Sequence, residues 1–120
     1  GNNNILECRV ERTGGVTVML DWQGHRLTAD AAGRTADVGD VVRVAVRPET
    51  LSARTSGGED DPGIAGQVRR RVFKGDRTVV TIGTRHGATL TAALDPLTAA
   101  QLGETVRIEI PPGAARVLAD

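Results

Sequence analysis

The amino-acid sequence predicts an all-β protein of two similar five-stranded barrels, packed together or strand-exchanged, with a short helix in the second copy. Three observations support this prediction. Apolar and polar residues alternate with a period of two along most of the chain, which is typical of strands with one buried face. The pattern of the first half recurs in the second half. Aromatic residues are almost absent, whereas Val, Ile, Leu and Ala are plentiful, so the core must be aliphatic.

The first copy begins with a strand, a hairpin and a returning strand. One face of the first strand carries Leu6, Cys8 and Val10. Gln23-Gly24 separates the next two strands and predicts a two-residue turn, because Gly adopts the positive φ that such turns need. The apolar faces of these two strands are formed by Val16, Val18, Leu20 and Trp22, and by His25, Leu27 and Ala29.

A fourth strand ends at a proline. Its apolar face is an alternation of valines, Val42, Val44 and Val46. Pro48 follows, and because it lacks a backbone donor and restricts the residue before it, it ends the strand and starts a crossover. Arg47 and Glu49 flank Pro48, where they can pair with each other or contact a neighbouring domain. A direct role in binding a small ligand is the alternative, and catalysis is not expected.

The internal repeat sets the predicted domain boundaries. Leu6-x-Cys8-x-Val10 matches Ile64-x-Gly66-x-Val68 at an offset of 58 residues. The valine strand after Gly39 matches the strand after Gly103 at an offset of 64. Two copies of one supersecondary unit follow from this self-similarity. We therefore predict a first barrel over residues 1–54, an exposed acidic linker over 55–63 and a second barrel over 64–120.

A short helix is predicted between the third and fourth strands of the second copy. Asp95 is suited to the N-cap, Pro96 to the first helical position, and Gly103 to the C-terminal end. Three strands, a short helix and two further strands is the order of an OB-type barrel. Because each copy alone buries little surface, we expect the copies to pack together or exchange strands.

Composition narrows the classes of function. Fifteen basic and fifteen acidic residues cancel, so no strong overall field attracts nucleic acid or an anionic membrane. Cys8 is the single cysteine, which excludes an intrachain disulfide and a cysteine-rich zinc site and fits a reducing compartment. No apolar run approaches the roughly 20 residues that span a bilayer.

Two further patterns are compatible with a binding site, one for a metal ion and one for nucleic acid. His25 and His86 sit at corresponding hairpin tips, but neither has another ligand at metal-binding spacing, so solvated turn histidines are favoured over a metal pair. The basic run Arg69-Arg70-Arg71, with Lys74 and Arg77, could line a single-stranded nucleic-acid groove. However, Phe73 is the sole aromatic residue of that half, and alternation predicts Arg69 and Arg71 on the face opposite Arg70, which disperses the charge.

Four stretches resemble one family: "NILECRV" (4–10), "GDVVRVAVRPETL" (39–51), "GIAGQVRRRVFKGDRTVVTI" (63–82) and "GETVRIEIPPGAARVL" (103–118). They are similar to the C-terminal transport-associated OB (TOBE) domain of ABC importer ATPase subunits, closest to the polyamine and ferric-iron importers. The sequence departs from the family pattern at Cys8, where a Gly is usual, and at Pro62, where an Asn is usual.

The resemblance implies a non-catalytic regulatory and dimerisation domain. No phosphate-binding loop occurs, so ATP and Mg²⁺ would bind an ATPase domain preceding Gly1, and this segment would hold no cofactor or metal and have no enzyme activity. The implied partners are that nucleotide-binding domain, a second copy of the subunit and, indirectly, the membrane permease subunits, with no nucleic acid. The implied location is the cytoplasm, peripheral to the inner face of the cell membrane.

The candidate interdomain or regulatory contacts are Arg47, Glu49, Trp22 and Arg77. Trp22 lies on an apolar face, which favours burial in the core or in a subunit interface. Some relatives of the resembled family bind oxyanions through backbone amides and Ser, Thr or Lys side chains. An oxyanion or small-ligand sensor, to which Arg77, Thr78, Thr81 and Thr84 could contribute, is therefore one alternative function, and a single-stranded nucleic-acid binder is the other.

Overall fold

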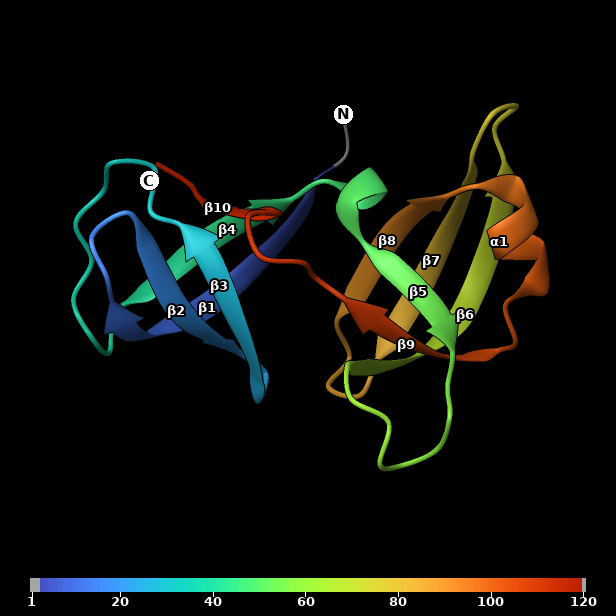
Figure 1. Ribbon diagram of the computed structural model, residues 1–120, viewed down its shortest axis with the longest axis horizontal. Coiled ribbons are helices and arrows are strands. Elements are labelled where there is room, and N and C mark those ends of the chain that lie inside the picture. Colours follow the sequence, from blue (N-terminus) through green and yellow to red (C-terminus); the bar gives the residue numbers. More distant parts are fainter. Residues whose placement is uncertain (1–2, 120) are drawn as a thin grey trace. The chain divides into compact units, whose positions relative to one another are not determined.

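The computed structural model describes residues 3–119, and nearly all of its regular structure is β (Figure 1). No helix in this range is long and apolar enough to cross a membrane. In chain order the elements are β1 (Asn4–Thr13), β2 (Thr17–Trp22), β3 (His25–Asp30), β4 (Val41–Val46), the 3-10 helix η1 (Pro48–Thr50), β5 (Ser52–Thr55), β6 (Ile64–Phe73), β7 (Thr78–Thr84), β8 (Thr89–Leu94), α1 (Pro96–Gln101), β9 (Thr105–Glu109) and β10 (Ala115–Val117).

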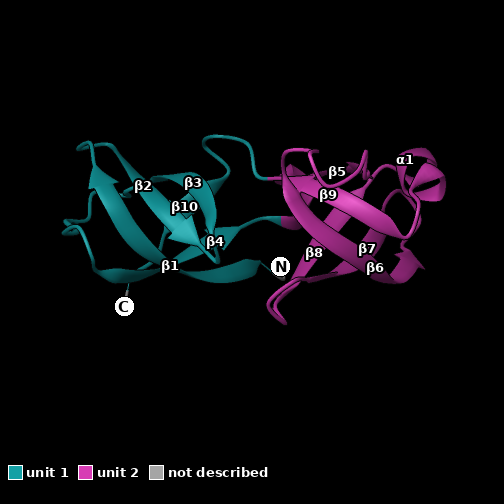
Figure 2. Cartoon of the chain, turned by 90° about the horizontal axis from the view of Figure 1, so that it is seen from below, with its two compact units in different colours: residues 1–47, 110–120 teal, residues 48–109 magenta. Residues whose placement is uncertain are grey.

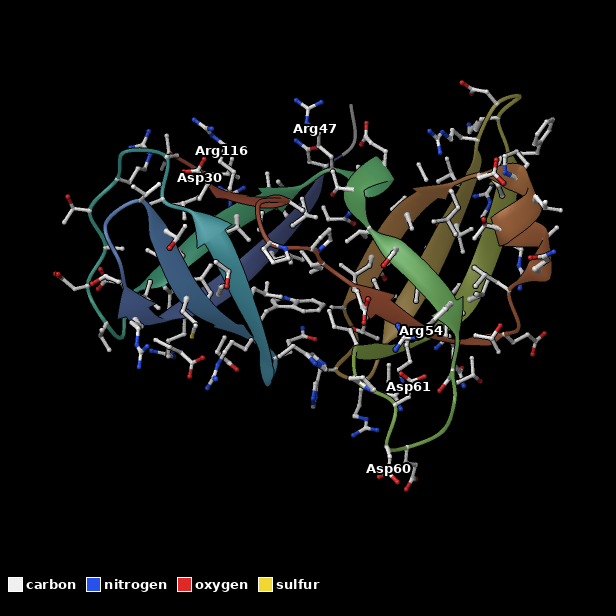
Figure 3. All side chains as sticks on the ribbon, in the orientation of Figure 1. Asp30, Arg47, Arg54, Asp60, Asp61 and Arg116 are labelled. Atoms are coloured by element: carbon white, nitrogen blue, oxygen red, sulfur yellow. The ribbon has the colours of Figure 1, made fainter. Side chains whose placement is uncertain are left out.

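The chain forms two compact units, shown in different colours in Figure 2. Unit 1 comprises residues 1–47 and 110–120 and is a closed barrel with the strand order β1-β2-β3-β10-β4. Strand β10 closes it, because it pairs in parallel with β3 and antiparallel with β4. Arg116 of β10 and Asp30 of β3 form an exposed ion pair across this seam, at 3.6 Å (Figure 3).

Unit 2 comprises residues 48–109 and contains a sheet with the order β5-β9-β6-β7-β8. All of its pairings are antiparallel. The sheet is curled, since β8 at one edge contacts both η1 and β5, which lie at the other. Together the two units confirm the predicted pair of five-stranded, OB-like barrels.

The units exchange strands, which was one of the two predicted arrangements. Strand β5 follows the first repeat in sequence but pairs with β9 in unit 2, and the last strand, β10, completes unit 1. The chain passes between units after Arg47 and after Glu109. The units are therefore not the consecutive segments 1–54 and 64–120 that the repeat predicted, because sequence self-similarity does not reveal which copy supplies the closing strand.

The cores are aliphatic, as composition predicted. Trp22 is the one aromatic side chain among the buried residues, and it is 3 % exposed. The largest fully buried side chains alternate along the strands in both units: Leu20, Ile82, Leu90, Ile108, Val10, Val44, Val46, Val80, Val106 and Cys8.

The hairpin turn, the helix cap and the strand end that local sequence predicts are all present. Gln23 and Gly24 both have positive φ, at 52° and 87°, as a tight hairpin turn requires. Asp95 caps α1 by accepting hydrogen bonds from the backbone N–H groups of Leu97 and Thr98, at 3.1 and 3.3 Å. Pro48 ends β4 and begins η1, so its predicted topological role is confirmed.

Both long strands also carry a β-bulge at matching positions. The register of β1 against β2 shifts between Val10 and Arg12, and that of β6 against β7 shifts between Val68 and Arg70. These positions are 58 residues apart, which is the offset of the repeat. Bulges re-aim side chains and are frequent next to functional sites. The inserted residue is Glu11 in β1 and Arg69 in β6.

Candidate functional site

An open groove of about 310 Å³ lies on unit 2, over the β6, β7 and β9 part of the sheet. Gln67 of β6 pairs with Gly83 of β7 on one side and with Thr105 of β9 on the other, so these residues form a row across three strands. The groove, called the unit 2 groove below, is lined by Ala65, Gly66, Gln67, Arg69, Gly83, Thr84, Arg85 and Thr105.

The bulge of β6 supplies the first cation of this groove. Arg69 is the unpaired residue between Val68, which faces Ile82, and Arg70, which faces Thr81. Its guanidinium lies over Gly83: a Cβ atom built on Gly83 would be only 2.7 Å from Arg69 Nε. The absence of a side chain at position 83 therefore makes room for the guanidinium.

The bulge also corrects the prediction for the basic run. Residues that face each other across an antiparallel pair share one side of the sheet, and Arg71 faces the fully buried Val80 whereas Arg70 faces Thr81. Arg71 thus shares the core side, and Arg69 lies over Gly83 on the other side. The prediction that Arg69 and Arg71 lie on one face of the strand and Arg70 on the other is wrong. The extra residue in the bulge reverses the order in which side chains alternate between the two faces.

Arg71 has a structural task instead. It donates hydrogen bonds to the carbonyl oxygens of Ala99 and Gly103, at 2.9 and 3.3 Å. These oxygens lie in the last turn of α1 and just after it, where a cation is favourable. The guanidinium of Arg71 is consequently used in holding α1 to the sheet.

Arg85, in the turn after β7, supplies the second cation of the unit 2 groove. Within residues 3–119, no side-chain hydrogen bond or ion pair engages Arg69 or Arg85. No acidic residue is among the lining residues. Thr84 donates its hydroxyl proton to the carbonyl oxygen of Ala88 at 3.0 Å. The other side-chain donors among the lining residues are the two guanidiniums, the Gln67 amide and the Thr105 hydroxyl.

Two other arginines of unit 2 are fully used in holding the loop over residues 56–63, below β5 in Figure 3. Arg107 donates to Ser56 Oγ at 3.3 Å and to the carbonyl oxygens of Gly58 and Gly63 at 2.8 and 3.4 Å. Arg54 forms an ion pair with Asp61 and donates to the carbonyl oxygen of Pro62 at 2.9 Å.

Asp61 is the acidic centre of this clamp. Its Oδ2 accepts a hydrogen bond from the backbone N–H of Gly57 at 2.6 Å. That hydrogen bond, together with the Arg54 guanidinium, lowers the pKa of Asp61 from its ordinary value. The neighbouring Asp60 is exposed at the loop tip (Figure 3). The predicted linker is therefore an ordered loop whose carboxylate at position 61 faces inward.

The four predicted contact residues lie on different elements, and none of them lines the unit 2 groove. Trp22 is buried at the end of β2, with its ring centroid 6.3 Å from that of His25. Arg47 and Glu49 are exposed on either side of Pro48, and Arg77 is exposed just before β7. Of the threonines considered for an oxyanion site, Thr84 alone borders the groove. Sequence reasoning missed Gly83 and Arg85, since only the strand register brings them beside Arg69.

For residues 3–119 the geometry supports neither a metal site nor a reactive cysteine. In the described part of the chain no three His, Cys, Asp or Glu side chains gather as a metal site would require. Cys8 is buried, and burial, with smaller contributions from Asp21 and Glu7, raises the pKa of its thiol to about 12. At neutral pH this thiol stays protonated and unreactive.

Comparisons with known proteins fit the strand topology. The chain, aligned over 98 % of its length, matches 96 % of the crystal structure of the cytoplasmic molybdate-binding protein ModG with molybdate bound, with a TM-score of 0.78 and 16 % sequence identity. This likeness concerns the fold. No curated protein sequence matches. The sequence model of the TOBE domain matches residues 44–118, which is more than half of the chain. The chain therefore belongs to the TOBE domain family.

Proposed function

We propose that this chain is a non-catalytic, oxyanion-binding TOBE module whose ligand occupies the unit 2 groove. The observation that carries the proposal is the pair of otherwise unengaged guanidiniums, Arg69 and Arg85, around a hollow without an acidic residue. The similarity in fold to a cytoplasmic molybdate-binding protein supports the same ligand class and a cytoplasmic location.

The chemistry of the groove suits an oxyanion. A guanidinium presents a planar fork of donors that matches two oxygens of one anion. The Arg69 guanidinium lies beside Gly83, where the absence of a side chain leaves room for it. Because both arginines are exposed, we expect binding to weaken as salt screens their charges.

The test is calorimetric titration of the chain with molybdate, tungstate, sulfate and phosphate at low ionic strength. We expect at least one of these anions to bind, and Arg69→Gln to weaken binding by about tenfold, the effect of losing one charge-assisted hydrogen bond. Arg70→Gln is the matched control, since Arg70 is the next residue of β6 and does not line the groove. No binding of any of the four anions, or equal losses in the two variants, would refute the proposal.

A second function, regulation of an ABC importer ATPase, is supported by a different observation. Arg47 and Glu49 are exposed where the chain leaves unit 1 at Pro48, and the Arg-Pro-Glu step on this strand resembles the importer subunits. In this role the module contacts its own nucleotide-binding domain and a second copy of the subunit, and through them the permease at the inner face of the membrane. A ligand that prefers one state of the ATPase dimer then shifts its population.

This second function is tested on the native reading frame. We expect an ATPase with a phosphate-binding loop to precede the segment, and Arg47→Ala or Glu49→Ala to change its ATPase rate or dimerisation. Arg12→Ala, at an exposed arginine of β1, is the control that should change neither. A reading frame without nucleotide-binding motifs would remove the importer assignment and leave anion binding by the module unaffected.

A further inference from the structure

The unit 2 groove is larger than a bare oxyanion needs. Its volume is about 310 Å³, whereas a tetrahedral anion has only a few times the 30 Å³ or so that a water molecule occupies in the liquid. Pockets for small organic molecules begin at about 300 Å³. An inorganic oxyanion between the arginines would therefore leave most of the groove to solvent.

The rest of the groove has a distinct chemistry. Its lining includes Ala65 and Gly66, which have a methyl group and no side chain, so a ligand there meets nearly bare backbone. Gln67 and Thr105, which face each other across β6 and β9, add an amide and a hydroxyl. Such groups can donate to and accept from ligand hydroxyls.

The groove is poorly suited to a nucleobase. Bases are held in open protein sites by stacking on aromatic side chains, and none of the lining residues is aromatic. The exposed Phe73 at the end of β6 is not among them. A hydroxyl-rich group matches the lining better than a planar aromatic ring does.

We propose that the unit 2 groove binds a phosphorylated sugar or polyol, with the phosphate on Arg69 and Arg85 and the hydroxyl-bearing carbon chain beside Gln67 and Thr105. This inference rests on the proposed anion-binding function and names the class of its ligand. The phosphate supplies charge-assisted hydrogen bonds, and the hydroxyl groups supply the discrimination between a phosphate ester and free phosphate.

The experiment compares five probes by calorimetry at low salt: glucose 6-phosphate, glycerol 3-phosphate, adenosine monophosphate, inorganic phosphate and glucose. We expect a sugar or polyol phosphate to bind at least about fivefold more tightly than inorganic phosphate, the gain from one or two additional hydrogen bonds. Glucose without phosphate should not bind, and adenosine monophosphate should gain nothing over inorganic phosphate.

Variants separate the two halves of the ligand. Arg69→Gln should weaken phosphate and phosphate esters alike, by about tenfold. The paired change Gln67→Ala and Thr105→Val should remove the advantage of the ester over inorganic phosphate. Arg70→Gln should change neither. Amide chemical shifts of Gly66 and Gly83 on titration report the place of binding independently of how well any variant folds.

The outcomes distinguish this inference from the function on which it rests. If inorganic oxyanions bind and the esters bind no tighter, the ligand class is refuted and the anion-binding function stands. Tighter binding of adenosine monophosphate than of the sugar phosphates would also refute it. If no anion binds, both proposals fail. Ester binding that shifts neither glycine amide would place the site elsewhere and overturn the inference.

Discussion

Units 1 and 2 share one framework but differ in charge at the bulge. In unit 1 the inserted residue of β1 is Glu11, which lies 3.6 Å from Arg26, and Asp21 of β2 faces Arg9. The corresponding residues of unit 2 are Arg69 and Gly83. Two acidic side chains in one copy are thus replaced by a guanidinium and an empty position in the other. The repeat thus preserves the backbone bulge, whereas the charge carried on the bulge differs between the two copies.

A second difference lies inside the barrels. Gly66 of β6 occupies the place of Cys8 in β1, and a Cβ atom on Gly66 would be only 2.5 Å from Cγ2 of Ile82. The residue of β2 that corresponds to Ile82 is Leu20, which has no branch at Cβ. Cys8 and Leu20 are both fully buried. The departure from the family pattern at Cys8 therefore fits a core in which the neighbouring side chain is unbranched at Cβ.

The largest expected effect comes from giving unit 2 the side chain of unit 1. We expect Gly66→Cys to destabilise the protein by about 2–3 kcal/mol, because overpacking forces Ile82 out of its place. Adding Ile82→Leu should recover a substantial part of the loss. Urea unfolding of the single and double variants measures both quantities. A single variant as stable as the wild type would show that Ile82 does not determine the residue at position 66.

Transferring the charge of unit 1 to unit 2 should weaken anion binding at the proposed site. Gly83→Asp places a carboxylate and its Cβ where Arg69 now lies, so we expect anion affinity to fall by tenfold or more, a change of about 1.4 kcal/mol. Asp21→Gly, the reverse change in unit 1, should leave affinity unaltered. Calorimetric titration of both variants provides the measurement. Unchanged binding in Gly83→Asp would mean that the anion binds outside the unit 2 groove.

The clamped loop of unit 2 should make stability depend on pH. The folded state lowers the pKa of Asp61, chiefly through the Gly57 N–H, so its stabilising contribution is present above the ordinary aspartate value of about 4. It is lost as pH falls through the lowered value. We expect Asp61→Asn to be less stable than the wild type at pH 7 and the difference to vanish in acid. A difference that does not shrink as the pH falls below 4 would contradict this account. Asp60→Asn, at the exposed tip, is the control.

The smallest effect concerns unit 1 alone and leaves the fold unchanged. Cys8 is the only thiol, and its raised pKa, together with burial, should protect it from thiol reagents at pH 7–8. Labelling should begin only at the denaturant concentration at which unit 1 opens. Comparing that midpoint with the loss of chemical-shift dispersion in unit 2 tells whether the strand-exchanged units unfold together. Rapid labelling in native buffer would contradict the burial of Cys8.

Particular residues show where sequence reasoning succeeded. Gln23-Gly24, Asp95 and Pro48 act through local backbone geometry, so the turn, the helix cap and the strand end could be predicted before any tertiary contact was known. Leu6 and Ile64, and likewise Val44 and Ile108, occupy matching positions of the two copies and are all buried, as the repeat implied. These signals depend on steric and hydrogen-bonding preferences of a few neighbouring residues.

The candidate site could be predicted less well from the sequence than the fold could. In the sequence, Arg69 is one of three consecutive arginines. No distinctive residue type marks the bulge that gives Arg69 and Arg71 different roles. Gly83 and Arg85 lie in a strand and a turn that alternation alone does not align with Arg69. Nothing in the sequence indicates that Arg54 and Arg107 form hydrogen bonds with the loop over 56–63.

The β class, the aliphatic core and the two copies could be predicted from periodicity and turn chemistry, which depend on local sequence. The pairing of β5 in unit 2 and of β10 in unit 1, and the position of Arg69 over Gly83, become visible only in the folded chain. The physical reason is that ladder hydrogen bonds join backbone groups common to every residue. Which strand closes a barrel, and which side chains then meet, depends on the packing of the whole chain.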